Sequence, residues 1–373
     1  MHVLVTIQHG ENVHLFKHAI EELREDGHEV SVFAREKDIN LDLLDAYDIE
    51  HTVLCGAPDG LFDLAAVQLR YEWSLLRAAR ALDPDVVLTS HGVAGPHVAT
   101  LLGARSVTFL DTEAHVAAQH KLFVPFSDEL HTPASLQSTF GETQRRYPGL
   151  HELAYLHPDR FEPDPSVLTS RGVDPDDRFF VVRLNAWDAH HDVGKGGFSP
   201  EEVDTLLETL SAHGTVFVSE ERTAERDRSV HRLPVEPHEI HHLMAFADLF
   251  VGDVTTMTVE AAVLGTPTVR VSPFATERDM GKFRLLEDEY GLCYSFHTTQ
   301  FTQALAVAES LASDPGADDA FATRRAELLA DTVDVTDYIV DQVTAQAQRA
   351  DDPASIPTRL LAAVGERLGG TPS

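Results

Sequence analysis

The sequence predicts an α/β protein of two domains, each built around a parallel β-sheet. The chain has 373 residues, which is too long for one ordinary α/β core and fits two domains of about 150–170 residues each. Short apolar runs alternate with amphipathic helical segments in both halves, the pattern of repeated β-α-β units. Residues 147–166 carry five prolines or glycines and no periodicity, so the domain boundary is expected there.

The first half opens with a β-α-β unit. An apolar strand at residues 2–8 is followed by a helix that places Val13, Phe16 and Ile20 on one face, and then by a strand at 28–34. The G-x-G-x-x-G pattern of dinucleotide-binding proteins is absent from this unit. Further strands are expected at 49–54, 85–89 and 106–110, and further helices at 40–46, 62–82 and 92–103.

The second half repeats this rhythm. Strands are expected at 178–184, 215–219, 268–271 and 292–296, and one more just before the turn at Gly252-Asp253, with helices at 200–212, 237–247, 256–264, 281–290, 299–312 and 318–330. The expected domains are residues 1–160 and 161–330, followed by a helix at 331–348 and by a linker and tail at 349–373.

The charge balance limits the partners of the protein. The chain has 61 acidic and 29 basic residues, and its net charge is −32. Such a surface stays hydrated in concentrated salt, and the acids are spread over the whole chain, so we expect a salt-adapted cytoplasm, as in a halophilic archaeon. Because a phosphate-binding surface must be basic, nucleic acid is not an expected partner.

The cysteines and the hydropathy pattern suggest a location. Cys55 and Cys293 lie in different expected domains without metal or redox spacing, so they are expected to be free thiols in a reducing compartment. The chain starts directly in a strand without a signal peptide, and no uncharged run reaches the length of a membrane span. We therefore expect a cytoplasmic protein, with the inner membrane face as a second option.

Residues 251–271 (VGDVTTMTVEAAVLGTPTVRV) are the most informative stretch. They predict a strand, a turn, a short helix and a second strand. Thr255 or Thr256 can cap the helix, Gly265 suits a left-handed C-cap, and Pro267 prevents further helix. The helix then presents bare N–H groups at the carboxyl edge of a sheet, where anions bind. Any parallel α/β protein has such turns, so the stretch alone does not separate ligand binding from structure.

Polar residues also follow the first strand. His9 stands at the strand end and His14 in the first turn of the helix. An imidazole titrates near neutrality and can accept a hydroxyl proton, so both are candidate general bases. Gly10 of this loop is a candidate substrate-binding residue. The alternative is that both histidines are solvated loop residues.

Two more loops follow strands in the first half. His91, in the sequence Ser90-His91-Gly92, can hold an acceptor or a phosphate, or only begin a helix. Asp111 and Glu113 place two carboxylates at the end of the next strand. They suit acid–base chemistry or hydrogen bonding to sugar hydroxyls, or a capping box for the next helix.

In the second half, the loop after the strand at 178–184 is rich in polar residues and glycine. Arg183 and Lys195 can neutralise a diphosphate, and Lys282 begins a later helix where it can meet the same nucleotide. The other candidate binding residues of this loop are His190, His191 and Asp192. Adjacent residues rarely chelate one ion together, so no metal site is expected.

Thr256 to Pro267 carry the pattern T-x-x-x-E-A-x-x-x-G-x-P. This pattern resembles the nucleotide-sugar signature of GT-B glycosyltransferases and of UDP-N-acetylglucosamine 2-epimerase. The resemblance implies two Rossmann-like domains with a cleft between them and a final helix that crosses back to the first domain. It also implies that the helix N-terminus faces a diphosphate, that Glu260 binds the ribose, and that a histidine of the first loop is the base.

The order of shorter motifs resembles a narrower family, the largely archaeal domain of unknown function 354. The motifs are residues 9–17 (HGENVHLFK), 26–30 (DGHEV), 43–49, 111–113, 154–158, 189–192 (AHHD) and 256–267. The match spans about residues 1–345. Two departures are that Ala-His follows Glu113 where His-Ala is expected, and that no glycine follows Asp253.

The resemblance implies a cytoplasmic enzyme of polysaccharide biosynthesis. It would transfer a sugar from a nucleoside-diphosphate donor to a glycan or lipid-linked acceptor, without a metal or a cofactor and with peripheral membrane contact as an option. His14, or Asp111 with Glu113, would deprotonate the acceptor. The alternatives are a nucleotide-sugar 2-epimerase and a non-catalytic nucleotide-binding protein.

Overall fold

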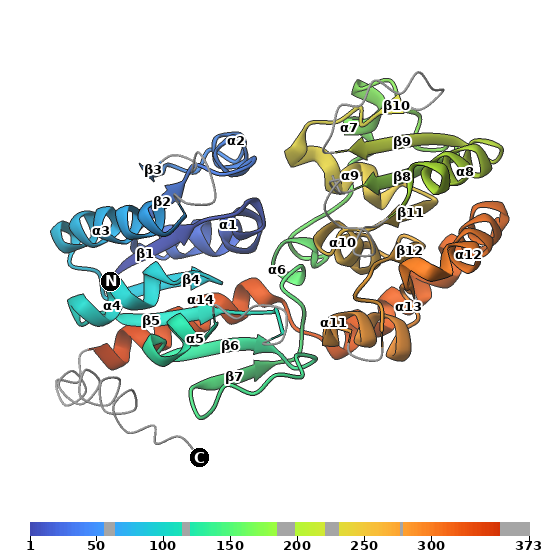
Figure 1. The fold of residues 1–373 in the computed structure, drawn as a ribbon. Helices are drawn as coiled ribbons and strands as arrows, with labels where there is room; N and C mark the ends of the chain where they lie inside the picture. Colours follow the sequence, from blue (N-terminus) through green and yellow to red (C-terminus); the bar gives the residue numbers. More distant parts are fainter. Residues whose placement is uncertain (56–63, 114–119, 185–197, 221–230, 277–278, 351–373) are drawn as a thin grey trace, which may run out of the picture. The chain divides into compact units, whose positions relative to one another are not determined.

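A computed structural model describes residues 1–55, 64–113, 120–184, 198–220, 231–276 and 279–350 (Figure 1). The chain forms two compact units. The first contains Met1–Tyr155 and the chain from Val333 onward, and the second contains Leu156–Thr332. The sequence analysis places the boundary five residues later, at 160/161.

The first unit is built on a seven-stranded sheet in the order β3-β2-β1-β4-β5-β6-β7, in which every pairing is parallel. Its strands are β1 (His2–Ile7), β2 (Glu29–Arg35), β3 (Thr52–Cys55), β4 (Val86–Ser90), β5 (Arg105–Phe109), β6 (Glu129–Pro133) and β7 (Gln144–Tyr147). Its helices are α1 (Gly10–Glu25), α2 (Asn40–Ala46), α3 (Leu64–Leu82), α4 (Ala94–Leu102), α5 (His120–Phe123) and α14 (Val335–Ala350). The short helix α6 (Leu153–Leu156) lies at the junction of the two units.

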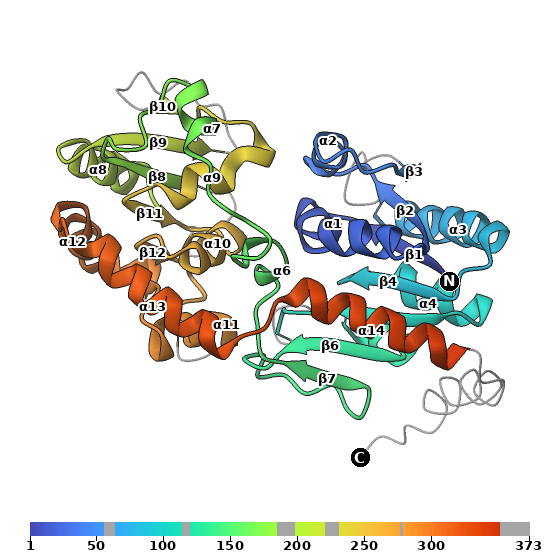
Figure 2. The same cartoon turned by 180° about the vertical axis from the view of Figure 1, so that it is seen from behind.

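Helices cover both faces of this sheet, so its central strands are almost entirely buried. Helices α3 and α4 lie on one face (Figure 1), and α1 and α14 lie on the other (Figure 2). On the first of these faces, Leu4 of β1 and Val87 of β4 pack against Tyr71 and Leu75 of α3. Burial on both sides explains why β1 and β4 are continuous runs of buried residues.

The sequence did not delimit β6 and β7, because ELHTP and QRRY carry charged side chains instead of an apolar run. These strands are placed by pairing with β5 and with each other. Tertiary pairing here overrides local propensity.

The last described helix, α14, belongs to the first unit and packs on α1, β4 and β5. Thr336 Oγ1 donates a 2.7 Å hydrogen bond to the carbonyl oxygen of Ala154. The Tyr338 hydroxyl lies 2.9 Å from Nδ1 of His131 on β6. The expectation of a C-terminal helix that returns to the first domain is thus confirmed.

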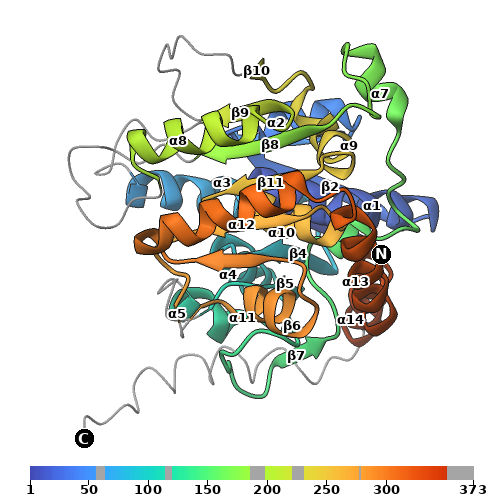
Figure 3. The ribbon, with the colours of Figure 1, turned by 90° about the vertical axis from the view of Figure 1, so that its right-hand side faces the viewer.

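The second unit is built on a six-stranded parallel sheet in the order β10-β9-β8-β11-β12-β13. Its strands are β8 (Phe179–Leu184), β9 (Thr215–Glu220), β10 (His231–Arg232), β11 (Leu249–Gly252), β12 (Thr268–Val271) and β13 (Tyr294–Phe296). Its helices are α7 (Pro165–Ser170), α8 (Pro200–Ser211), α9 (Ile240–Ala245), α10 (Thr256–Leu264), α11 (Gly281–Arg284), α12 (Phe301–Ser313) and α13 (Ala317–Asp331). Figure 3 shows α8 and α12 along one face of this sheet, while α9 and α10 pack together on β11 and β12.

Helix α10 has the bounds that the sequence predicts. Gly265 ends it with φ of +85°, in the left-handed region where glycine is favoured. Thr255, one of the two predicted caps, is the N-cap residue, and its side chain makes no capping hydrogen bond. The predicted helix at 281–290 is also divided, into α11 and a π-helical turn at Leu285–Glu289.

Among the described residues, no helix combines the length and the apolar character needed to cross a membrane.

The carboxylate of Glu129 links β6 to α14, and we predict that it makes stability depend on pH. Its contact with His131 is the chief cause that lowers its pKa to about 2, and Arg349 of α14, 2.9 Å away, adds to the shift. Because the folded pKa lies below the ordinary value of 4.5, this stabilisation is complete above that value and is lost as the pH falls toward 2. In urea unfolding, Glu129→Gln should lower stability at pH 7 and flatten its decline between about pH 5 and pH 3.

Glu142→Gln is the control, since this glutamate is exposed in the same unit. A wild-type pH profile for Glu129→Gln would contradict the assignment.

Candidate functional site

The strongest cluster of reactive side chains lies at the carboxyl edge of the first sheet. Strands β1, β4 and β5 are parallel neighbours, so the loops that follow them open on the same edge. A Cβ atom at Gly92 would lie 2.5 Å from Nε2 of Gln8 and 2.8 Å from Oγ1 of Thr89. A side chain at this position would have to displace Gln8 and Thr89, so the glycine permits the close approach of the loops after β1 and β4.

His91 and Asp111 form the centre of this cluster. Nε2 of His91 lies 2.9 Å from Oδ1 of Asp111, and the two side chains are 12% and 11% exposed. Nδ1 of His91 lies 2.8 Å from the Ser90 hydroxyl. With Nε2–H donating to the carboxylate, Nδ1 accepts from Ser90, and the three groups form a continuous hydrogen-bonded chain.

The backbone at His91 is strained. Its φ of +54° lies in the left-handed region, which is uncommon for residues other than glycine. Its amide donates a 3.2 Å hydrogen bond to the carbonyl oxygen of Phe109 on β5, which anchors the turn. Strain of this kind costs about 1–3 kcal/mol and is concentrated at functional sites.

Two further histidines surround Asp111, and the sequence analysis did not select them. Nδ1 of His151 lies 3.9 Å from Oδ2 of Asp111, the carboxylate oxygen other than the one that His91 contacts. His120 is 3% exposed, and its ring nitrogens have no hydrogen-bond partner in the described part of the chain. Burial lowers its pKa to about 4, with His91 adding to the shift, so it is neutral at pH 7. The only sequence signal for either residue is a histidine beside an apolar segment, which is weak.

His9 lies at the same edge, at the start of α1. Nζ of Lys37 is 3.0 Å from its Nδ1. Burial, followed by the charge of Lys37, lowers the pKa of His9, so its ring is neutral at physiological pH. The side chain of Asn12 accepts hydrogen bonds from the amides of Gln8 and His9, at 3.2 Å each, and fixes this turn.

Two other predicted residues have packing contacts. His14 is buried on α1, with Nδ1 3.2 Å from the Tyr47 hydroxyl and its ring stacked on Tyr155. A Cβ atom at Gly10 would lie 3.3 Å from the Ile39 side chain, so this glycine permits close packing. Neither environment resembles the open edge occupied by His9 and His91.

Glu113 is buried and binds the loop after β6. Its carboxylate accepts hydrogen bonds from the amide of Gln137 at 2.8 Å and from the amide of Ser138 at 2.9 Å. The Ser138 hydroxyl is a third donor. A carboxylate that accepts three hydrogen bonds from this loop anchors it beside Asp111.

In the second unit, Glu260 of α10 is buried and paired. Its Oε1 lies 3.1 Å from Nε2 of His241 on α9. Thr255 and Thr256 stand at the start of α10, directly after β11, where the predicted anion site would be. Arg183 near the end of β8 donates a 2.7 Å hydrogen bond to the Ser219 hydroxyl on β9.

Lys282 is buried on α11. This short helix is held to the sheet by a buried ion pair, in which Arg270 of β12 contacts both oxygens of Asp279 at 2.6 and 3.3 Å. The guanidinium also lies 3.5 Å from the ring centre of Phe283. The predicted binding residues His190, His191, Asp192 and Lys195 lie outside the described residues.

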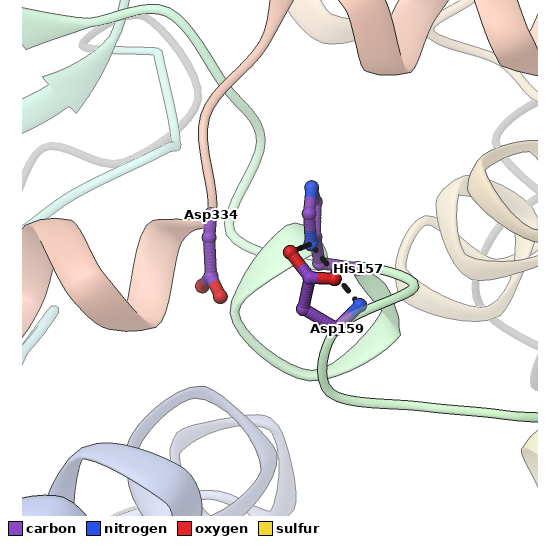
Figure 4. Close-up of side chains that lie close together, drawn as sticks. All are labelled: His157, Asp159 and Asp334. Carbon is purple, nitrogen blue, oxygen red and sulfur yellow. Dashed lines mark hydrogen bonds and ion pairs between the residues drawn. The ribbon is translucent and has the colours of Figure 1, made fainter.

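His157 and Asp159 form a separate polar contact at the start of the second unit (Figure 4). Nδ1 of His157 is 3.4 Å from Oδ2 of Asp159 and 3.3 Å from its amide nitrogen. Asp334, the third residue drawn, belongs to the first unit, where it accepts a 2.8 Å hydrogen bond from the amide of Thr336. The expectation that no metal is bound stays a prediction.

Comparisons with known proteins agree with this architecture. A family model described as a protein of unknown function (DUF354) matches residues 1–345. An uncharacterized protein of Methanocaldococcus jannaschii is 24% identical over 284 residues, which is 73% of this chain and 82% of the relative.

Solved structures match nearly the whole chain. The spinosyn forosaminyltransferase SpnP has a TM-score of 0.63 at 16% identity, over 92% of this chain and 99% of its own. A proposed UDP-N-acetylglucosamine 2-epimerase from Listeria monocytogenes has a TM-score of 0.69 at 13% identity, over 94% and 98%. The glycosyltransferase VinC, in complex with dTDP, has a TM-score of 0.63 at 13% identity, over 94% and 100%. These likenesses show a GT-B-like fold of two Rossmann-like, parallel-sheet domains.

We predict that Glu113 supports the site by holding its neighbouring loop. Glu113→Gln removes the charge from three hydrogen bonds and should destabilise the protein by about 1–3 kcal/mol. Differential scanning calorimetry would measure the loss. Glu36→Gln, at an exposed position of the same unit, should leave the melting temperature unchanged. An unchanged melting temperature for Glu113→Gln would show that the anchor is dispensable.

Proposed function

The chain belongs to the family of proteins of unknown function DUF354, and from that premise we propose that it is a glycosyltransferase. It would transfer a sugar from a nucleoside-diphosphate donor to a hydroxyl group of a glycan or lipid-linked acceptor. The observation that carries the proposal is the contact between His91 and Asp111 at the carboxyl edge of the first sheet. In a GT-B-like fold, a paired imidazole at this edge supplies the proton acceptor that sugar transfer to a hydroxyl requires.

The hydrogen bonds at His91 indicate which of its ring nitrogens would accept the proton of the acceptor hydroxyl. In the tautomer that donates Nε2–H to the Asp111 carboxylate, the lone pair of Nδ1 is the basic position. In the proposed reaction the acceptor hydroxyl takes the place of Ser90 Oγ at Nδ1 and gives its proton to the ring. The Asp111 carboxylate then stabilises the resulting imidazolium. His9 and Lys37 would bind the acceptor beside this pair.

The donor is assigned to the second unit. The first turn of α10 offers backbone N–H groups and the positive end of the helix dipole, which together favour a diphosphate. Arg183, Lys195 and Lys282 would add positive charge, and Glu260 would bind the ribose while His241 orients its carboxylate. The complex of VinC with dTDP supports a nucleoside diphosphate as the ligand class. With these groups neutralising the leaving diphosphate, the proposed reaction needs no metal or cofactor.

We predict that the His91–Asp111 pair carries the chemical step. His91→Asn keeps a residue that tolerates the left-handed backbone, and Asp111→Asn removes the charge that holds the ring. Each should lower kcat/KM by about 10²–10⁴-fold, the usual size of general-base catalysis. The assay for kcat/KM is the release of UDP or dTDP from a panel of nucleotide sugars in high salt. It is run with and without an archaeal-type lipid or glycan acceptor.

His14→Phe is the matched control for these variants. It keeps an aromatic ring against Tyr155 and should stay within about threefold of the wild-type activity, well inside the loss expected for a general base. If His14→Phe abolished turnover while His91→Asn did not, the base would be His14 and the assignment made here would be wrong.

Donor turnover without an acceptor separates the alternative functions. A 2-epimerase would convert the donor sugar to its C2 epimer, detectable by NMR, whereas a transferase would leave it unchanged or hydrolyse it slowly. Tight nucleotide binding without turnover in any mixture would favour a non-catalytic nucleotide-binding protein.

We predict that Glu260→Gln weakens the binding of UDP or dTDP about tenfold, the loss expected for one charge-assisted hydrogen bond. Isothermal titration calorimetry with the free nucleotide measures this without any acceptor. Glu208→Gln, an exposed position on α8 of the same unit, should bind as the wild type does. Unchanged affinity in Glu260→Gln would move the ribose contact to another residue.

A further inference from the structure

The outer face of α3 differs in charge from the rest of the protein. Its exposed residues, which we call the α3 face, are Leu69, Arg70, Trp73, Arg77, Arg80 and Ala81. They include three arginines and no acid, in a chain with 61 acidic and 29 basic residues. By contrast, the exposed residues of α1 are Glu11, Glu21 and Glu25.

The α3 face is also apolar to an unusual degree. Leu69 is 68% exposed and Trp73 is 69% exposed, the two highest values among the exposed large hydrophobic residues of the described chain. They are four residues apart, so they lie one above the other on the helix. The opposite side of α3 is firmly buried, since Tyr71 and Leu75 have no exposed surface and pack in the core of the first unit. The exposure of Trp73 therefore follows from well-anchored helix packing.

The arginines and the indole share one shallow groove of about 410 Å³. Trp73, Leu76, Arg77, Arg80 and Ala81 line it. A groove with an aromatic ring, an aliphatic side chain and two guanidinium groups suits a ligand that has anionic and apolar parts side by side. The phosphate layer of a lipid bilayer has this character.

Helices α4 and α5 add further exposed apolar and basic residues near the α3 face. His97 of α4 lies 3.4 Å from Glu72 of α3 and 2.9 Å from the carbonyl oxygen of Leu122 on α5. Leu122 is therefore close to α3, and both it and Lys121 are exposed. Leu101, one turn beyond His97 on α4, is exposed as well. Figure 1 shows α3, α4 and α5 on one side of the first sheet.

We propose that the α3 face docks the protein on the surface of an anionic lipid bilayer. Trp73 and Leu69 enter the boundary between headgroups and acyl chains, and Arg77 and Arg80 contact lipid phosphates. Charge selects this occupant, because a protein of net charge −32 is repelled by an anionic surface except where a basic face points toward it. The groove and the exposed indole explain why that face is apolar as well as basic. This inference does not rest on the proposed sugar transfer, because its readout is binding alone.

The first experiment is flotation of the full chain with vesicles of phosphatidylcholine alone or of phosphatidylcholine with phosphatidylglycerol. Binding to the anionic vesicles only is expected. The double variant Arg77→Gln with Arg80→Gln should reduce bound protein about tenfold in dilute salt. The control double variant Arg232→Gln with Arg284→Gln removes two exposed arginines from the second unit and should bind as the wild type does.

The salt dependence of vesicle binding separates the electrostatic contribution of the arginines from the apolar contribution of Trp73 and Leu69. At about 1 M salt the Debye length is about 3 Å, so binding there should depend on Trp73 and Leu69 more than on the arginines. Trp73→Ala should then lose most of the remaining binding, while Phe274→Ala, another exposed aromatic in the second unit, should not. Circular dichroism of each variant checks that the fold is kept.

Tryptophan emission tests the depth of insertion. Trp73 and Trp187 are the only tryptophans, so Trp187→Phe leaves a single reporter. Its emission should shift to shorter wavelength with anionic vesicles and be quenched by brominated lipid. Equal binding to neutral vesicles, or binding that survives both arginine substitutions and Trp73→Ala, would overturn the proposal. Tighter binding of oligo-dT than of vesicles, with the same dependence on these residues, would assign the face to nucleic acid instead.

Discussion

The parallel pairing of β4 with β5 is the constraint on which the candidate site depends. Ser90 pairs with Phe109 at the last position of this ladder, so both strands end at the same level and His91 and Asp111 follow within two residues. The left-handed backbone at His91, anchored by its amide to Phe109, turns the ring toward β5 instead of along its own strand. The strained turn and the 2.9 Å contact with Asp111 are thus one feature. The register of β4 and β5 brings the two residues to the same level of the sheet. The left-handed φ of His91 then places its ring in contact with the Asp111 carboxylate.

Sequence periodicity and the glycine and proline signals predicted the two-domain α/β fold. They did not delimit β6 and β7, and they did not predict the partners of each polar side chain. Helix α10 could be placed to the residue, because its apolar core, Gly265 and Pro267 are local signals that agree with one another. The edge that carries His9, His91 and Asp111 could also be predicted, because parallel strands bring their loops together whatever the details. Which of these side chains faces the open edge is a different question. It is decided by groups that lie far away in the sequence.

His14 and Glu113 illustrate this limit. His14 is covered by Tyr47 and Tyr155, and the second of these follows it by more than one hundred residues. Glu113 receives its hydrogen bonds from residues 24 and 25 positions later. Both contacts join segments that are distant in the sequence, and neither helical nor strand periodicity indicates which segments meet. His151 was missed for the same reason, since its contact with Asp111 joins a segment without periodicity to the end of β5.

The charge state of the site reflects a competition between the acidity of the whole protein and local burial. A net charge of −32 gives the protein a negative potential, which favours cations at its surface. Burial is nevertheless the largest effect at His9, His120 and His131, and lowers the pKa of each. At His9 the positive charge of Lys37 acts in the same direction. Burial therefore keeps His9 and His120 neutral at pH 7 in a strongly acidic protein, and a neutral imidazole is the form that can accept a proton from a hydroxyl group.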